Sequence, residues 1–168
     1  FRVETGIAGL PTAVMGEAGA GGPIIAILGE FDALPGLSQE AGIAQERPIE
    51  AGGNGPGCGH NLLGAGAMMA ATAVKDYLAA NGLAGRIRYY GCPAEEGGSA
   101  KGFMVHAGLF RDVDIAICWH PAVLAGVNTP ISLACAEMFF HFTGRASHAA
   151  AAPHLGRSAL DAVELLNV

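Results

Sequence analysis

The sequence has little charge and no concentration of positive charge. Only 14% of its 168 residues are charged, and 9 Lys and Arg stand against 15 Asp and Glu, a formal net charge of −6. Proteins that bind nucleic acid carry basic patches that neutralise phosphates, and the absence of such a patch argues against nucleic acid as a partner. No apolar run reaches the roughly 20 residues that a membrane-spanning helix needs, so no membrane association is expected.

Cysteine is also scarce. The chain has four Cys residues, at Cys58, Cys92, Cys118 and Cys135. They are too few and too scattered for the disulfide framework of a small secreted protein. A reducing, cytoplasmic setting is therefore the expectation.

Motifs for several other chemistries are missing. The sequence contains neither a phosphate-binding loop nor a complete dinucleotide-binding fingerprint. The segment Gly97–Lys101 (GGSAK) only half resembles a nucleophile elbow, because its final residue is not Gly. Nucleotide binding and serine-based hydrolysis are therefore weak hypotheses.

What the sequence does contain is apolar residues and glycine. Hydrophobic residues make up 51% of the chain, and most of the 26 Gly residues cluster around apolar runs, as in an α/β protein with tight turns. A short strand is expected within residues 1–22. Further strands are predicted at Pro23–Gly29, Arg86–Cys92 and Val113–Trp119, and helices at His60–Asn81 and Ser99–Phe110, with Ser99 as N-cap. This order predicts an α/β fold with a parallel-type sheet and helices on its faces.

Two further features concern the organisation of the chain. Residues 35–57 are rich in Gly and Pro and are predicted to form a long loop, which in a compact domain is usually functional. From residue 130 onward the sequence pattern changes. Ser132–Thr143 is predicted to be a long strand and Gly156–Val168 a helix. We therefore expect one domain over residues 1–129 and the start of a second over residues 130–168. Both ends lack start and stop signals, so the chain is expected to belong to a longer protein.

Side chains suited to metal binding and acid–base chemistry follow each predicted strand. In open α/β sheets, ligands bind beyond the carboxyl ends of the strands, so residues at those positions are expected to converge. Seven residues qualify: Glu30 and Asp32 after the first apolar strand, Glu95 and Glu96 after the next, His120 after the third, and Cys58 and His60 before the long helix.

Two pairs among these residues have the character of a metal site. Cys58-Gly59-His60 offers a thiolate and an imidazole, both good ligands for a divalent first-row metal. The adjacent Glu95 and Glu96 repel each other unless a cation or proton compensates, so one could bind a metal while the other acts as a general base toward water. Each pair also has a plain interpretation, namely a buried Cys with a helix-start His, and a solvated acidic loop.

Asp32, His120 and His148 each allow more than one interpretation. Asp32, in Asp-Ala-Leu-Pro, could form a turn, or it could hold a metal-ligating His in its productive tautomer. His120 at a strand end could be a ligand or a satisfied core His. His148 lies far along the chain, and the pattern alone indicates no more than a surface or core His.

Four segments occur in an order that resembles the M20 metallopeptidases. They are Glu30–Pro35 (EFDALP), Gly57–Asn61 (GCGHN), Pro93–Gly98 (PAEEGG) and Trp119–Pro121 (WHP). The later segment Gly144–Ala159 is similar to the start of that family's lid, or dimerisation, domain. The Cys indicates the amidohydrolase branch. Within it, Cys58–Gly64 and Pro153–Glu164 look most like the B-type subunit group of the aminobenzoyl-glutamate hydrolases, with β-alanyl-dipeptidase-like proteins close behind.

The resemblance implies a role for individual residues. Cys58, His60, Glu96 and His120 match the family's metal ligands. Glu95 matches the general base, and Asp32 matches the carboxylate that tunes a metal ligand. His148 matches the lid His that stabilises the oxyanion in the partner subunit's site. The resemblance also implies that residues 1–129 are the N-terminal part of the catalytic domain and that residues 130–168 begin an α+β lid domain.

The resemblance implies a dinuclear metal-dependent hydrolase that cleaves an amide bond in N-acyl amino acids or dipeptide-like substrates such as p-aminobenzoyl-glutamate. Two divalent ions, zinc or manganese, are the expected cofactors. A homodimer formed through the lid domain, or a heteromeric partner subunit, is the expected assembly. Two alternatives stay open: a catalytically silent metal-binding or dimerising paralogue, and an N-acetyl-amino-acid deacetylase of the same branch.

Three departures from the family pattern qualify the resemblance. Asn61 stands where many relatives have Asp, which fits the subgroup. Glu30 stands where peptidase relatives carry a metal-binding His, which favours the Cys-type site. The family's last metal ligand, a His near the C-terminus of the full-length chain, has no counterpart in these residues.

Overall fold

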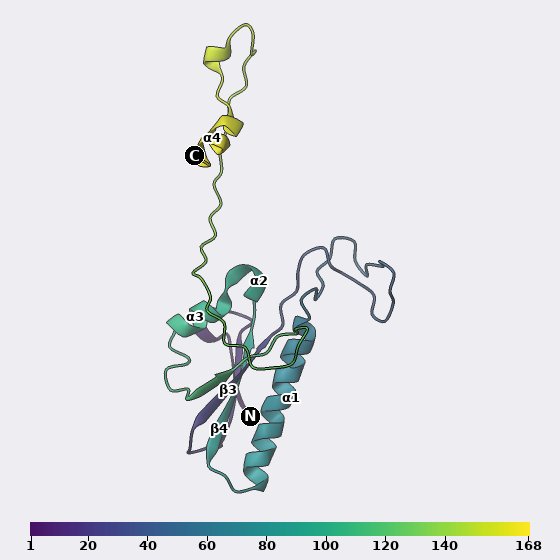
Figure 1. Ribbon diagram of the computed structural model, residues 1–168, viewed down its shortest axis with the longest axis vertical. Coiled ribbons are helices and arrows are strands. Elements are labelled where there is room, and N and C mark those ends of the chain that lie inside the picture. The colour runs from purple at the N-terminus through teal and green to yellow at the C-terminus, as the bar shows by residue number, and fades with distance from the viewer. The chain divides into compact units, whose positions relative to one another are not determined.

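The computed structural model describes residues 1–168, and the contacts of the chain divide it into two units, Phe1–Ala125 and Gly126–Val168. The first unit is built on a five-stranded sheet with the order β1-β2-β4-β3-β5 (Figure 1). Its strands are β1 Arg2–Thr5, β2 Val14–Ala20, β3 Ile24–Glu30, β4 Gly85–Cys92 and β5 Ile115–Ile117.

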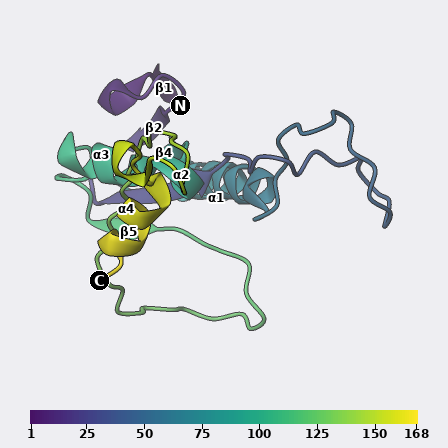
Figure 2. The same cartoon turned by 90° about the horizontal axis from the view of Figure 1, so that it is seen from above.

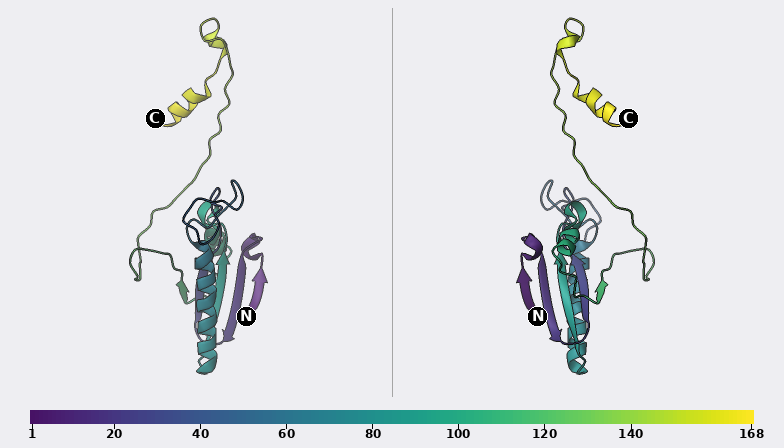
Figure 3. Two further views of the ribbon diagram at one scale, coloured as in Figure 1. Left: turned by 90° about the vertical axis from the view of Figure 1, so that its right-hand side faces the viewer. Right: turned by 90° about the vertical axis from the view of Figure 1, so that its left-hand side faces the viewer.

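The sheet is mixed rather than purely parallel. β3 runs parallel to both β4 and β5, as predicted. β1 and β2 run antiparallel to their neighbours and form one margin of the sheet (Figure 3). The sequence predicted only one short strand in this region, because the Gly- and Ala-rich β2 has little intrinsic strand propensity. The hydrogen bonds of β2 to β4 on one side and to β1 on the other stabilise it as a strand despite this low propensity.

α1 His60–Ala80 covers one face of the sheet and α3 Ala100–His106 packs on the other, so the first unit is an α/β structure, as predicted. A single turn, α2 Glu95–Gly98, follows β4. Successive strand residues point to opposite faces. Ile27 and Ile87 pack against Ala67 of α1, whereas Tyr90 packs on the other face in a cluster with Met104 of α3. No helix combines the length and the apolar character needed to cross a membrane.

A buried arginine fastens the segment after α3 to the sheet. Arg88 of β4 donates to both carboxylate oxygens of Asp112, at 2.8 and 2.9 Å, and to Glu17 at 2.8 Å. The hydroxyl of Tyr90 donates to the carbonyl oxygen of Leu109 at 2.6 Å. The hydrogen bonds to Asp112 raise the pKa of Arg88, and those from Arg88 lower the pKa of Asp112. The pairing compensates the burial of the guanidinium charge.

Two helices differ in detail from the prediction. α3 is shorter than expected. Ser99 stands at its N-cap position, as predicted, but its φ of 49° is left-handed rather than extended, and its side chain makes no capping hydrogen bond. The last helix, α4, spans Ala159–Leu166, and Ser158 caps it by accepting a hydrogen bond from the backbone N–H of Asp161 at 3.0 Å.

The predicted strand Ser132–Thr143 is wrong, because these residues form no regular secondary structure. A strand needs a hydrogen-bonded neighbour. The unit Gly126–Val168 contains only the 3₁₀ turn η2 Pro153–Leu155, α4 and an isolated bridge between Arg145 and Arg157. The assignment of residues 130–168 to a lid or dimerisation domain stays a prediction.

Candidate metal centre

The chemistry-bearing side chains gather at the carboxyl edge of the parallel strands. β3 ends at Glu30, and the segments that follow β4 and β5 carry Glu95–Glu96 and His120. Because the three strands are parallel, these segments begin at the same edge of the sheet. α1 also begins there, with His60 as its first residue, and the loop that precedes it extends away from the sheet (Figures 1 and 2).

Two glycines let α1 lie directly on the end of β3. A Cβ at Gly29 would lie 2.9 Å from the Cβ of Ala67 and 3.0 Å from the Cα of Gly64. A Cβ at Gly64 would lie 2.8 Å from the carbonyl oxygen of Glu30. Both positions therefore need Gly, because the backbones approach more closely than a side chain allows. This approach places His60, in the first turn of α1, beside the end of β3.

Gly29→Ala is expected to destabilise the protein by about 1–3 kcal/mol, because the added methyl pushes α1 away from the sheet. Gly102→Ala in α3 is the control, since a Cβ there meets nothing within 4 Å. That control should be neutral or slightly stabilising, because Ala favours helix over Gly. Chemical denaturation measures both free energies of unfolding. Equal stability of the two variants would contradict the close packing of α1 on β3.

His60 is 1% exposed, and both of its ring nitrogens have acidic neighbours. Nδ1 lies 2.9 Å from Oδ1 of Asp32, and Nε2 lies 3.1 Å from Oε2 of Glu30. A carboxylate accepts hydrogen bonds, so a ring proton on Nδ1 would be donated to Asp32 and one on Nε2 to Glu30. With the proton on Nδ1, Nε2 carries a lone pair, which is the form of imidazole that binds a metal ion.

Asp32 joins two of the sequence motifs. Its Oδ1 contacts His60, and its Oδ2 accepts a hydrogen bond from the backbone N–H of Glu96 at 3.0 Å. Burial raises the pKa of Asp32, but the hydrogen bonds from Glu96 and His60 outweigh it, so the pKa lies below its ordinary value. Asp32 is therefore a carboxylate at neutral pH. This geometry supports the interpretation of Asp32 as the group that orients a metal-ligating His.

Glu95 and Glu96 form the first turn of α2 and both face His60. The nearest carboxylate oxygen of each lies 3.9 Å from Nε2 of His60. The residue before them, Ala94, has a φ of 48°, a left-handed conformation that costs a non-Gly residue on the order of 1–3 kcal/mol. Two neighbouring carboxylates repel each other unless a cation or a proton compensates, so this position favours a cation.

Cys58 and His120 complete a second group of donors. Sγ of Cys58 lies 3.1 Å from Nε2 of His120. The ligand atoms of Cys58, His60 and His120 all lie within 4.8 Å of one another, and so do those of Glu30, His60 and Glu95. Burial, together with the neighbouring carboxylates, raises the pKa of the Cys58 thiol.

One member of the cluster is not signalled by the sequence. Lys101 of α3 forms an ion pair with Oε1 of Glu30. Burial lowers the pKa of Lys101, but the hydrogen bond to Glu30 outweighs it, so the pKa is raised. The contact depends on how α3 packs through its buried residues Ala100 and Met104. No local pattern around Lys101 could have identified it.

The structure brings together six of the seven residues to which the family resemblance gives a role. They are Asp32, Cys58, His60, Glu95, Glu96 and His120. The seventh, His148, belongs to the unit Gly126–Val168, where its Nδ1 accepts a hydrogen bond from the backbone N–H of Ala151 at 3.0 Å. The roles of all seven residues stay predictions.

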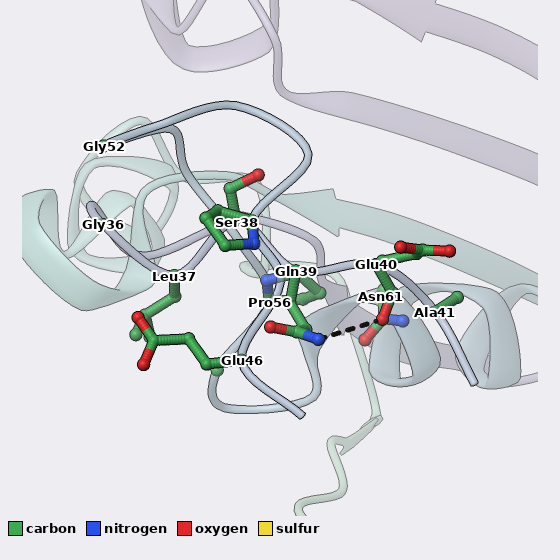
Figure 4. A pocket seen from close by; sticks show the side chains of 12 residues that line it. Gly36, Leu37, Ser38, Gln39, Glu40, Ala41, Glu46, Gly52, Pro56 and Asn61 are labelled. Atoms are coloured by element: carbon green, nitrogen blue, oxygen red, sulfur yellow. Dashed lines mark hydrogen bonds between the residues drawn. The ribbon is translucent and has the colours of Figure 1, made fainter. Parts of the chain in front are cut away.

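The long loop between β3 and α1 forms a separate hollow of about 680 Å³ (Figure 4). Residues 36–41 form half of its lining, which also includes Asn61, the neighbour of His60. Gln39 holds the loop together, because its amide donates to the carbonyl oxygen of Gln45 at 2.8 Å and accepts from the backbone N–H of Arg47 at 3.0 Å. None of the residues in the cluster around His60 lines this hollow, so we place the chemistry at that cluster.

Residues 26–164 match the profile described as peptidase family M20/M25/M40. The chain belongs to this family. This M20 chain is 53% identical to the B-type subunit of p-aminobenzoyl-glutamate hydrolase of Escherichia coli (strain K12), over 99% of this chain and 34% of that protein. It is 34% identical to Xaa-Arg dipeptidase of Mus musculus, over 94% of this chain and 34% of that protein. The chain thus spans about a third of the length of these relatives.

A solved structure shares the fold of the M20 chain. It is the YXEP protein of Bacillus subtilis, described as a dinuclear metal binding peptidase from the M20 family. The similarity has a TM-score of 0.53 and 25% sequence identity, and it covers 68% of this chain and 31% of that chain.

Proposed function

We propose that the full-length protein is a metal-dependent hydrolase that cleaves an amide bond in N-acyl amino acids or dipeptide-like substrates such as p-aminobenzoyl-glutamate. One observation carries the proposal: the soft and borderline donors Cys58, His60 and His120 lie close together, and the carboxylates of Glu95 and Glu96 lie beside His60. The reaction class follows membership of the M20 family, and the substrate follows the name of the relative that is 53% identical.

The donor set fits divalent metal ions. We assign Cys58, His60, Glu96 and His120 as metal ligands, because they combine sulfur, nitrogen and oxygen donors around one small volume. Thiolate and imidazole favour zinc, while the carboxylates would also suit manganese. When bound, the ions polarise the scissile carbonyl and make a water molecule more acidic. The number of ions, two, follows the relative described as dinuclear.

The chain's own residues transfer the proton, position a ligand and stabilise the oxyanion. Glu95 accepts the proton of the attacking water and returns it to the leaving amine, as a general base and then a general acid. Asp32 holds His60 by its Nδ1–H, at 2.9 Å. By resemblance to the family, His148 donates a hydrogen bond to the developing oxyanion in the partner subunit's site. A reduced Cys58 is required in this scheme, which supports the predicted reducing, cytoplasmic setting.

The test is amide hydrolysis by the full-length, metal-loaded protein on a panel that includes p-aminobenzoyl-glutamate, N-acetyl amino acids and dipeptides. Turnover of p-aminobenzoyl-glutamate supports the proposal, and turnover of N-acetyl amino acids alone moves the assignment to a deacetylase of the same branch. A protein that binds zinc and hydrolyses nothing on the panel contradicts the proposal and favours a silent metal-binding paralogue.

Asp32→Asn is expected to lower metal affinity by about 10–100-fold, the usual effect of losing the carboxylate that orients a ligating His. Asparagine offers one carbonyl acceptor and one amide donor, so it no longer favours a single tautomer of His60 as strongly. Competition with a chromophoric zinc chelator measures the affinity. Asp76→Asn on the exposed side of α1 is the control. Unchanged zinc affinity in Asp32→Asn would leave Asp32 as a turn residue only.

A partner subunit is part of the proposal, because the relative that is 53% identical is named as one subunit of its enzyme. A homodimer through residues 130–168 is the alternative assembly. Light scattering of the full-length protein distinguishes a monomer that awaits a partner from a dimer of identical chains.

A further inference from the structure

Glu30 has a position in the cluster that the proposed roles do not use. It is the last residue of β3, and its side chain is 13% exposed. One carboxylate oxygen pairs with the ammonium of Lys101, and the other lies 3.1 Å from Nε2 of His60. The carboxylate therefore links α3 to the first residue of α1.

Glu30 and His60 belong to a group of donors that could hold one metal ion. Oε2 of Glu30 lies 3.1 Å from Nε2 of His60, and the ligand atoms of Glu30, His60 and Glu95 all lie within 4.8 Å of one another. Nitrogen and oxygen ligands lie about 2.0–2.2 Å from zinc, which separates two ligands of the same ion by about 3–3.5 Å. The distance of 3.1 Å fits two ligands of one ion, as it also fits a hydrogen bond from a protonated Nε2.

The ion pair with Lys101 leaves one carboxylate oxygen of Glu30 free to bind a metal ion. The Lys101 ammonium occupies Oε1 and leaves Oε2 directed at His60. Lys101 also adds a positive charge to an acidic cluster. The cluster contains four carboxylates and the Cys58 thiol, and the ammonium of Lys101 pairs with one of these carboxylates. With the thiol ionised, two divalent ions and one ammonium would neutralise five negative charges.

We propose that Lys101 is a positioning residue of the metal centre, which holds Glu30 so that its second oxygen serves as a further oxygen ligand beside His60. The inference rests on the proposed function, because it concerns the metal ions of that site. It gives Glu30 a role that the match of the other donors to the family does not assign. It also explains why a half-buried Lys lies within an otherwise acidic cluster.

Four variants of the full-length protein test this inference: Lys101→Met, Lys101→Arg, Glu30→Gln and the double variant Lys101→Met with Glu30→Gln. Zinc content after gel filtration and zinc affinity by chelator competition are the readouts. We expect Lys101→Met to weaken the binding of one zinc ion by about 10–100-fold, the usual effect of losing a residue that orients a ligand, and Glu30→Gln to weaken it by at least as much. Lys101→Arg should retain most of the affinity. The double variant should be no weaker than Glu30→Gln alone, since both changes act on the same ligand.

Lys75→Met is the matched control, because the side chain of Lys75 is 34% exposed against 32% for Lys101 and pairs with Asp76 on α1. It should bind zinc like the wild type. If Lys101→Met binds zinc normally and only melts at a lower temperature, the ion pair is structural and the inference is wrong. If Lys101→Met does not fold, normal zinc affinity in Glu30→Gln overturns the inference equally. A wild-type protein that binds neither zinc nor manganese overturns the proposed function itself.

Discussion

Glu95→Gln is expected to lower the kcat for amide hydrolysis by about 10²–10⁴-fold and to leave the metal content unchanged. Glutamine keeps the size and polarity of the side chain but accepts no proton at neutral pH. The chemical step therefore loses its base, while the proposed ligands Cys58, His60 and His120 stay in place. Steady-state kinetics on the substrate identified from the panel, beside elemental analysis of bound metal, measures both quantities.

The neighbouring residue supplies a sharp control. Glu96 lies at the same distance of 3.9 Å from Nε2 of His60 as Glu95 does, but it is assigned as a ligand. Glu96→Ala should therefore lose metal as well as activity, whereas Glu95→Gln loses activity alone. An active Glu95→Gln enzyme would remove Glu95 from the mechanism. Metal loss in both variants would mean that the two carboxylates share one role.

Cys58→Ser is expected to weaken zinc binding by more than the roughly 100-fold that a supporting residue costs, because it removes a direct ligand. A serine hydroxyl is not ionised at neutral pH and is a poor ligand for zinc, whereas a thiolate binds strongly. Chelator competition measures the loss. Cys135→Ser is the control, because Cys135 is an exposed residue of the unit Gly126–Val168.

The pH dependence of zinc binding gives an independent check on Cys58. Burial and the nearby carboxylates raise the pKa of this thiol, so at neutral pH it is protonated before the metal binds. Metal binding must then release that proton, and zinc affinity must rise with pH. In weakly buffered solution the wild type should release more protons per bound zinc than Cys58→Ser does. Equal proton release by the two proteins would contradict a thiolate ligand.

The parallel core of the fold was predictable because its signals are local. β3 is a short, continuous apolar run, and α1 is a long segment rich in Ala, Leu and Met that ends before Asn81-Gly82. β2 was harder, because its Gly and Ala residues become a strand only by pairing with β1 and β4. The failed strand at Ser132–Thr143 is the converse case, in which a largely apolar segment finds no neighbour to pair with.

The sequence by itself determined which donors are available and at which strand ends they stand: Cys58 and His60 before α1, Glu95 and Glu96 after β4, and His120 after β5. That much follows from chain order, since parallel strands end at a common edge. Only the tertiary structure decided how the donors face one another. The contacts of Asp32 with His60 and with Glu96, and the pairing of Lys101 with Glu30, each join segments at least 28 residues apart. Such contacts depend on how helices pack on the sheet, which no local pattern encodes.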